Sequence, residues 1–422
     1  MSTILIINYA FPPFGGAASR RVTKLVKYLG RRGHNCVIVT ASRTNNPLYD
    51  ESLLKEPPST ARVVRTPSLE PVTRSGKSRI VSKIRRLVNI PMIPNVTSLW
   101  AVCAVLPALR AARAYRPDAI ICSAPEFPAF LVGVIIKART NVPLILDYRD
   151  EWSYHPEKME SLKNSRLKSI KQKLEERLEK STARRADGII ANTASFAEMM
   201  TSRLQVPARK IKVITNGYDP DDFPDEAPDA PPSDKTVITH LGTIDHVSLF
   251  PPLLIRSLDR AALETDSQVE LRLVGNVYPE LRKNIERVKV QRIKICFRGF
   301  VPAQKAYELL RQSDLNIQVN ELLPGKERYH NLKLFDYLYS EKPMLVYGPK
   351  ESEIARIAAR SGLARVVEPG DSGPLFDFFK SFLKGGFSVA PDRDYIRGFA
   401  WPELAGKVED FLKELKEGKS DL

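Results

Sequence analysis

An apolar run that leads into paired glycines and then into a helical pattern limits the fold of this chain most. Ile4–Ile7 are apolar, a Pro-rich turn ends at Gly15 and Gly16, and 17–32 has helical periodicity. Because a second apolar run follows at 36–40, the segment predicts a strand, a helix and a parallel strand. Paired glycines there let a phosphate approach the free N–H groups of the helix, and a tight turn alone is the alternative.

This turn is not the dinucleotide-binding fingerprint. The chain has no G-x-G-x-x-G there and no acidic residue at the end of the second strand, so NAD is not expected. The five histidines and four cysteines are scattered without the spacing of metal ligands. We therefore expect no cofactor and no protein-bound metal.

Strands and helices alternate along the whole chain, which predicts an α/β protein with mostly parallel, doubly wound sheets. The alternation stops at 219–235, where acidic residues and prolines predict an exposed linker, and then restarts. We therefore predict two Rossmann-like domains that face each other across a cleft, with ligands bound beyond the carboxyl ends of the strands.

The formal net charge of +16 favours a polyanionic partner. No helix-turn-helix, RNA-recognition or zinc-finger pattern occurs, so no nucleic acid is expected. Residues 74–86 contain six basic and no acidic side chains, with apolar residues at helical spacing, and 88–109 adds Trp100 and an apolar helix. This pattern is typical of contact with an anionic membrane, expected over 74–93, and a solvated helix packed on its own domain is the alternative.

The sequence also predicts where the protein acts. No apolar run has transmembrane length, and a strand begins at the first residues without a signal peptide. The four cysteines lie mostly in predicted elements and indicate buried thiols in a reducing compartment. We expect a cytoplasmic protein that is peripheral at the inner face of the cell membrane.

A helix followed directly by a strand, over 333–346, contains the second candidate site. Lys333 and Asp336 are three residues apart and therefore lie on one face of the helix. A lysine suits a diphosphate, and a carboxylate accepts hydrogen bonds from the hydroxyls of a ribose. A surface ion pair between the two side chains is the alternative.

The chain resembles retaining glycosyltransferases of the GT-B fold, the family 4 or group 1 class. Lys333–Val346 is similar to the family's K-L-F-E-Y-L-x-x-G-K-P-V-L segment, and Pro12–Gly16 to its P-x-x-G-G loop. Asp147–Trp152 resembles D-x-R-D-x-W, Ile214–Asp219 resembles I-x-N-G-V-D, and the closing Phe399–Leu404 segment also matches. These motifs lie in the expected order and span nearly the whole chain.

The resemblance implies an acceptor-side domain at 1–215 and a nucleotide-sugar-binding domain at 216–399, with helix 400–418 packed back on the first domain. It implies transfer of a sugar from a nucleotide-diphosphate sugar to a lipid-linked or polysaccharide acceptor, with retention of the anomeric configuration. Such enzymes need no metal, because backbone dipoles and basic side chains stabilise the departing diphosphate.

The resemblance also gives roles to single residues. The hinge residues are expected to be Asn216 and Gly217. The acceptor-side residues are expected to be Arg20, Glu126 and Arg149. The donor-binding residues are expected to be Gly15, Gly16, Gly242, Thr243, Arg328, Lys333 and Asp336. The catalytic residues are expected to be Asp150, His246 and Glu327.

The chain departs from the family's pattern at the donor and acceptor sites. After Gly242 it lacks the Arg and Lys that grip the diphosphate. His246 is the only nearby candidate, and Arg328 or Lys333 is the candidate replacement from farther along the chain. Arg328 also stands where the family has the first Glu of E-x7-E, with Glu327 one residue earlier, and Glu126 follows the third strand, where many relatives have His. A catalytically silent nucleotide-binding or partner protein is therefore the alternative function, with an epimerase and a DNA glucosyltransferase ranked lower.

Overall fold

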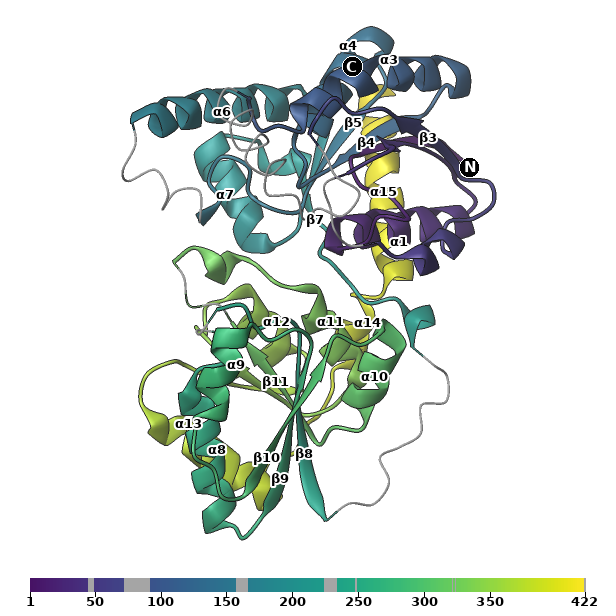
Figure 1. Ribbon diagram of the computed structural model, residues 1–422. Helices are drawn as coiled ribbons and strands as arrows, with labels where there is room; N and C mark the ends of the chain where they lie inside the picture. Colours follow the sequence, from purple (N-terminus) through teal and green to yellow (C-terminus); the bar gives the residue numbers. More distant parts are fainter. Residues whose placement is uncertain are drawn as a thin grey trace. The chain divides into compact units, whose positions relative to one another are not determined.

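The computed structural model describes residues 1–44, 49–71, 92–156, 166–223, 234–246, 249–320, 322 and 324–420. The chain divides into two compact units, Met1–Thr215 with the closing helix from Trp401, and Asn216–Ala400. Each unit contains one parallel sheet with helices on both faces (Figure 1), so the predicted α/β class is confirmed. The basic segment at 74–86 lies outside the described residues.

The first sheet has seven parallel strands in the order β3-β2-β1-β4-β5-β6-β7. The strands are β1 (Thr3–Asn8), β2 (Asn35–Ala41), β3 (Arg62–Thr66), β4 (Ala119–Ser123), β5 (Leu144–Tyr148), β6 (Gly188–Ala191) and β7 (Ile211–Val213). The helices are α1 (Ala17–Arg31), α3 (Ser98–Tyr115), α4 (Pro128–Thr140), α6 (Arg166–Arg185), α7 (Ala194–Leu204) and α15 (Trp401–Ser420), with the short 3-10 helices η1 (Glu51–Lys55) and η3 (Ala208–Lys210). At the centre of the sheet, Ile4 lies opposite Cys36 of β2 and Ala119 of β4.

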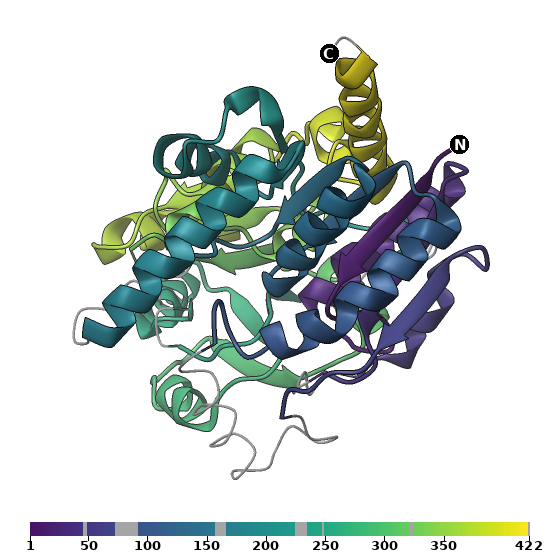
Figure 2. The ribbon, with the colours of Figure 1, turned by 90° about the horizontal axis from the view of Figure 1, so that it is seen from above.

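Both faces of the first sheet are buried, so its central strands have nearly continuous apolar runs. Along β1, Ile4 and Ile6 pack with α1 and α15, whereas Leu5 and Ile7 pack with α3 and α4. Figure 2 shows α3, α4 and α6 side by side over one face of this sheet. On the other face, α15 lies against α1. The C-terminal helix and the N-terminal strand β1 therefore share one hydrophobic core.

Trp100 corrects one prediction, because it does not belong to a membrane-facing stretch. Its ring is fully buried, packs edge to face against Tyr9 with 5.3 Å between ring centroids, and its indole N–H donates to Thr66 Oγ1 at 2.8 Å. A large ring with a satisfied N–H stabilises the core, and the exposed apolar side chains of α3 are instead Val102 and Leu106. Of the described helices, none is both long and apolar enough to cross a bilayer.

The four cysteines are free thiols, and the prediction that they are buried is correct for two of them. Cys36 and Cys122 lie inside the first unit, where burial raises the pKa of Cys36 to about 12 and also raises the pKa of Cys122. Cys103 and Cys296 are only half-buried, because each lies on an element that has one side toward solvent.

The second sheet has six parallel strands in the order β10-β9-β8-β11-β12-β13. The strands are β8 (Lys235–Leu241), β9 (Gln268–Val274), β10 (Ile293–Gly299), β11 (Leu315–Val319), β12 (Met344–Tyr347) and β13 (Ala364–Val367). The helices are α8 (Pro252–Glu264), α9 (Pro279–Glu286), α10 (Ala303–Arg311), α11 (Leu332–Ser340), α12 (Glu353–Arg360), α13 (Ser372–Leu383) and α14 (Arg393–Arg397), with the short 3-10 helices η4 (Pro220–Asp222) and η6 (Lys326–Arg328). One face packs against α8, α9 and α13, and the other against α10, α11, α12 and α14.

Arg21 joins the places where the chain leaves the first unit, at Thr215, and returns to it, at Trp401. Its guanidinium makes a two-pronged ion pair with Asp147, with N–O distances of 3.0 and 2.8 Å. It also donates to the carbonyls of Ile214 at 2.9 Å and Thr215 at 2.7 Å, and lies 5.8 Å from the centre of the Trp401 ring. The Arg21 and Asp147 side chains are 3% and 1% exposed, so the pair is buried and hydrogen-bonded throughout.

Replacing Arg21 by Met leaves the Asp147 carboxylate buried without its cation. We expect Arg21→Met to lower the free energy of unfolding by about 3–5 kcal/mol, which urea unfolding of the full chain measures. Arg32→Met is the matched control, because Arg32 pairs with Glu409 at 2.7 Å while 41% exposed, and we expect a loss below about 1 kcal/mol. Equal losses in the two variants would contradict the role given to Arg21.

Candidate functional site

The turn between β1 and α1 presents backbone N–H groups at the carboxyl edge of the first sheet. Gly16 has a φ of 90°, a conformation that favours glycine, and it is the N-cap residue of α1. No side chain of the described residues caps this helix, so the N–H groups of its first turn lack a capping oxygen there. Gly15 is buried in the same turn, and Arg20 is half-buried on the first turns of α1.

The other predicted residues of the first unit follow neighbouring strands. Arg149 and Asp150 come directly after β5, where Arg149 is buried and Asp150 is half-buried. The side chain of Asn192, after β6, donates to the Arg149 carbonyl at 3.2 Å and fixes the backbone there. Glu126 accepts hydrogen bonds from Thr97 at 2.8 Å and Asn95 at 3.4 Å, so its carboxylate holds the segment that precedes α3.

The predicted hinge residues, Asn216 and Gly217, are the first residues of the second unit, and both are buried. Immediately after them the Tyr218 N–H donates to the Phe399 carbonyl at 3.2 Å, and Tyr218 forms a parallel bridge with Ala400. The segments where the chain enters and leaves the second unit therefore run side by side. The hinge function of these residues stays a prediction.

Three glycines end adjacent strands of the second sheet. Gly242, Gly275 and Gly299 end or directly follow β8, β9 and β10, and all three have positive φ. A Cβ on Gly275 would lie 2.4 Å from the Gly242 carbonyl oxygen, so only glycine allows this approach. The result is a surface of bare backbone at the carboxyl edge of the sheet, where α/β proteins bind their ligands.

Lys333 extends from the first turn of α11 across this backbone. A Cβ on Gly242 would lie 2.9 Å from the Lys333 Nζ, so the lysine occupies the space above the glycine. Within the described chain the ammonium makes no hydrogen bond or ion pair, which also excludes the alternative of a pair with Asp336. Burial lowers the pKa of Lys333 to about 8, and the charge of Asp245 opposes this shift.

The surroundings of Lys333 suit an anion. A cation in the first turn of a helix is repelled by the positive end of the helix dipole, and burial adds the cost of desolvation. An anion bound beside the ammonium would reverse both effects, and phosphate is the anion that a lysine and a helix N-terminus commonly bind together. Lys333 therefore offers the cation that the sequence lacks directly after Gly242.

The remaining predicted residues of the second unit lie on neighbouring loops. Glu327 and Arg328 form η6, just before α11, and their side chains pair at 3.7 Å. Thr243 and His246 are exposed after β8, and Asp336 is half-buried on α11. Their proposed contacts with a ligand stay predictions.

Two exposed aromatic residues of the second unit were not among the residues predicted from the sequence. Tyr278 follows β9 and is 54% exposed, and Phe300 follows β10 and is 76% exposed. Exposed rings that follow these strand ends suit stacking on a planar base. The sequence contains a pattern that could have predicted them. In both cases the aromatic residue comes shortly after a glycine at the end of a strand, Gly275 or Gly299.

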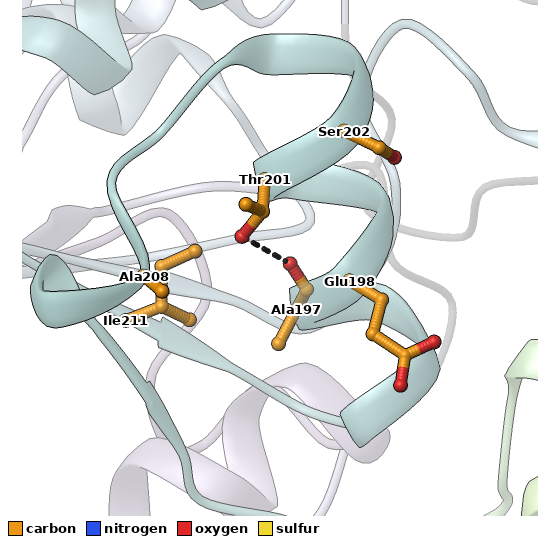
Figure 3. Close-up of a pocket in the computed structure, with 6 residues that line it drawn as sticks. All are labelled: Ala197, Glu198, Thr201, Ser202, Ala208 and Ile211. Atoms are coloured by element: carbon orange, nitrogen blue, oxygen red, sulfur yellow. Dashed lines mark hydrogen bonds between the residues drawn. The ribbon is translucent and has the colours of Figure 1, made fainter.

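The first unit has a hollow of about 430 Å³ (Figure 3), and none of the predicted site residues lines it. It is lined by residues of α7 and of the segment from η3 to β7, which are Ala197, Glu198, Thr201, Ser202, Ala208 and Ile211. The Thr201 hydroxyl donates to the Ala197 carbonyl at 3.1 Å within α7. Because this lining has small side chains and no cation, it does not suit a phosphate.

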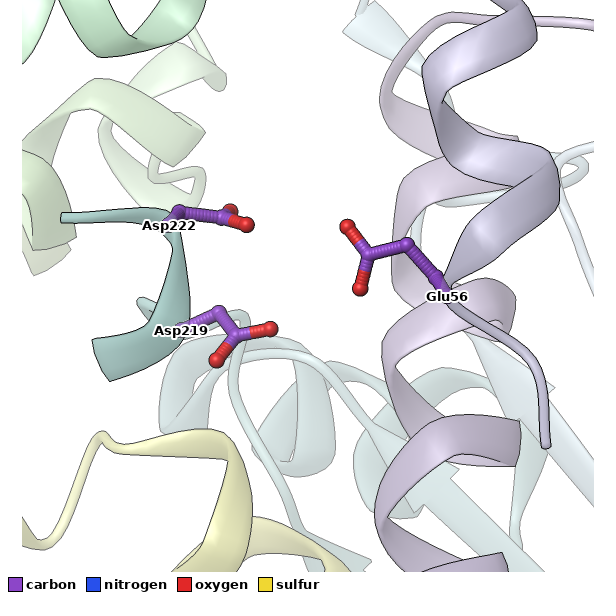
Figure 4. A group of neighbouring side chains, drawn as sticks. All are labelled: Glu56, Asp219 and Asp222. Carbon is purple, nitrogen blue, oxygen red and sulfur yellow. The ribbon is translucent and has the colours of Figure 1, made fainter. Parts of the chain in front are cut away.

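Figure 4 draws three acidic side chains from different units, Glu56 of the first and Asp219 and Asp222 of the second. Glu56 pairs with Lys24 at 2.6 Å and Lys27 at 3.2 Å. Asp219 caps η4 by accepting from a backbone N–H. Glu56 and Asp219 therefore each have hydrogen-bond or ion-pair partners within their own units. We assign no cation site to either unit.

Comparison with known proteins agrees with this architecture. The family model for Glycosyltransferase Family 4 matches residues 14–222. Anabaena HepE in complex with UDP is 16% identical over all of both chains, with a TM-score of 0.61. WaaG, a glycosyltransferase involved in lipopolysaccharide biosynthesis, is 15% identical over 99% of this chain and 98% of its own, with a TM-score of 0.57.

A third solved structure is similar over the same length. The lipopolysaccharide outer core galactosyltransferase WaaB is 12% identical over 98% of this chain and 99% of its own, with a TM-score of 0.59. Identities this low show a shared fold, and no curated protein matches the sequence. Residues 14–222 therefore belong to Glycosyltransferase Family 4, and the chain as a whole has the GT-B fold of these solved glycosyltransferases.

Proposed function

We propose that this protein transfers a sugar from a nucleotide-diphosphate sugar to a lipid-linked or polysaccharide acceptor, with retention of the anomeric configuration. The observation that carries the proposal is the Lys333 ammonium above the Gly242 backbone, which has no hydrogen-bond or ion-pair partner among the described residues. A diphosphate at this position would supply the negative charge that the site lacks. The HepE structures with UDP and UDP-glucose support a uridine nucleotide as the first donor to test.

The groups that contact the diphosphate matter most for the reaction. They must stabilise the negative charge that develops on the diphosphate as its bond to the sugar breaks. Lys333 is the proposed source of the opposing charge, with Arg328 as a second cation, and a metal is therefore not required in this proposal. Asp336 is proposed to accept hydrogen bonds from the ribose hydroxyls, and Tyr278 and Phe300 to stack on the base.

The other proposed roles follow the family resemblance and rest on residues at the carboxyl edges of the two sheets. Gly15 and Gly16 are proposed to offer backbone N–H groups to a phosphate. The proposed catalytic groups are Asp150, His246 and Glu327. The proposed acceptor-side groups are Arg20, Glu126 and Arg149.

Removing the Lys333 charge should weaken binding of the donor. We expect Lys333→Met to raise the Kd of UDP by about 10- to 100-fold, the loss of one charge-assisted hydrogen bond, in calorimetric titrations. Lys350→Met is the control, because Lys350 is exposed and pairs with Glu368 at 2.7 Å, and its UDP affinity should stay within about twofold of the wild type.

Transfer itself is tested with a panel of nucleotide-sugars and membrane lipid extract. Mass spectrometry of the products identifies the sugar, and proton NMR of the new glycosidic bond reports its configuration. Unchanged UDP binding in Lys333→Met would remove Lys333 from the donor site. UDP binding without any product would instead favour a silent binding protein.

The pKa of Lys333 predicts how donor binding changes with pH. With a pKa of about 8, the amine is mostly charged at pH 7 and mostly neutral at pH 9, so UDP affinity should fall by up to about tenfold over this interval. Lys333→Arg should abolish this dependence, because a guanidinium stays charged throughout. A pH profile that is the same in wild type and Lys333→Arg would contradict the proposal.

We further propose that the protein acts at the cytoplasmic face of a membrane, a proposal supported by the basic segment at 74–86. Each of its six basic side chains is worth roughly 1 kcal/mol near an anionic surface. Replacing all six by Gln should abolish flotation with vesicles that contain phosphatidylglycerol. The same number of replacements among exposed basic residues of the second unit should leave flotation intact, and flotation of the first variant would contradict this part.

A further inference from the structure

Arg149 is a buried cation, and within the described chain two of its three side-chain nitrogens have no acceptor. The residue is 7% exposed and lies at the carboxyl edge of the first sheet, directly after β5. Its Nε and Nη1 atoms are fully buried, and neither donates a hydrogen bond to a residue that the structure describes. Within the described chain, no carboxylate lies close enough to form an ion pair with it.

The two acids near Arg149 do not balance it. Asp147 is already engaged, because its carboxylate accepts hydrogen bonds from two nitrogens of Arg21 and from the Ser123 hydroxyl at 2.7 Å. Asp150 is half-buried and attracts Arg149 without an ion pair. Burial lowers the pKa of Arg149 and the charge of Arg21 adds to the shift, while Asp150 and Asp147 oppose it.

Such an arrangement is costly for the folded protein. Buried donors without acceptors lose their hydrogen bonds to water, and an arginine cannot escape the cost by giving up its proton. The backbone is nevertheless held in place, because the Ala124 N–H donates to the Asp147 carbonyl at 3.0 Å and the Asn192 amide donates to the Arg149 carbonyl at 3.2 Å. The backbone that carries the buried side chain is therefore held before any ligand binds, which reduces the cost of ordering this segment on binding.

We propose that Arg149 binds a phosphate or carboxylate group carried by a substrate of this enzyme. The planar guanidinium presents parallel N–H donors that match the two oxygens of either anion. The inference rests on the proposed function and deepens it, since the molecule that meets the first unit must carry an anionic group. That group belongs either to the acceptor or to the diphosphate of the donor, and both offer the same chemistry to Arg149.

A substitution to Met separates binding from folding. If Arg149 serves a ligand, Arg149→Met removes an unpaired buried charge, so the melting temperature in phosphate-free buffer should stay unchanged or rise by roughly 2–4 °C. If Arg149 is instead a structural residue, the same variant should melt more than about 5 °C lower. A lower melting temperature of that size, or failure to fold, overturns the proposal.

Inorganic phosphate is the probe for binding, and all proteins are full-length and carry Lys333→Met so that the proposed donor site does not contribute. Phosphate should raise the melting temperature of this background relative to chloride at equal ionic strength, and the rise should disappear in Arg149→Met. Arg149→Lys keeps the charge and should retain part of the rise, and Arg32→Met should retain all of it. An equal phosphate response with and without Arg149 overturns the proposal.

UDP titrations identify the source of the anion in the protein with native Lys333. If the anion belongs to the acceptor, Arg149→Met should bind UDP within about twofold of the wild type, and phosphate should bind together with UDP. If it belongs to the donor, the Kd of UDP should rise at least about tenfold and phosphate should compete with UDP. The phosphate result is independent of turnover, so a failure of the proposed transfer activity is distinguished from a failure of this inference.

Discussion

The buried ion pair between Arg21 and Asp147 organises the carboxyl edge of the first sheet. It connects α1, whose start is the glycine turn, to the end of β5, and it also holds the carbonyls of Ile214 and Thr215. One guanidinium thus links the helix that follows the proposed phosphate-binding turn to the point where the chain leaves the unit. Because a buried pair is stable only when all its hydrogen bonds are made, the geometry tolerates little change.

The same pair explains why Arg149 lacks a partner. Asp147 is two residues away from it in sequence, but its oxygens are taken by Arg21 and Ser123. Among the described residues, a second cation therefore stays buried at the same edge without an ion-pair partner. Burying this cation destabilises the folded protein. We propose that the residue is present because a ligand supplies the missing negative charge.

The second unit presents the same electrostatic problem in another way. Lys333 lies over the backbone of Gly242, in the first turn of a helix that already repels a cation. Burial lowers its pKa and the nearby Asp245 compensates only in part. Each unit thus has an unneutralised cation beyond the carboxyl ends of parallel strands, which suits an enzyme whose proposed substrate carries a diphosphate.

The sequence by itself determined the two sheets, because runs such as Ile4–Ile7 and the spacing of apolar residues in α11 are local properties of the chain. It missed β3, whose Arg-Val-Val-Arg-Thr sequence is short and mostly exposed at a sheet edge, and it misplaced Trp100, since burial depends on what packs against a helix. Tertiary structure alone decided that Lys333 crosses Gly242, 91 positions apart in the numbering (333 − 242), and that Asp147 pairs with Arg21 and leaves Arg149 unpaired. The physical reason is that charge balance depends on distances through space, which no local pattern contains.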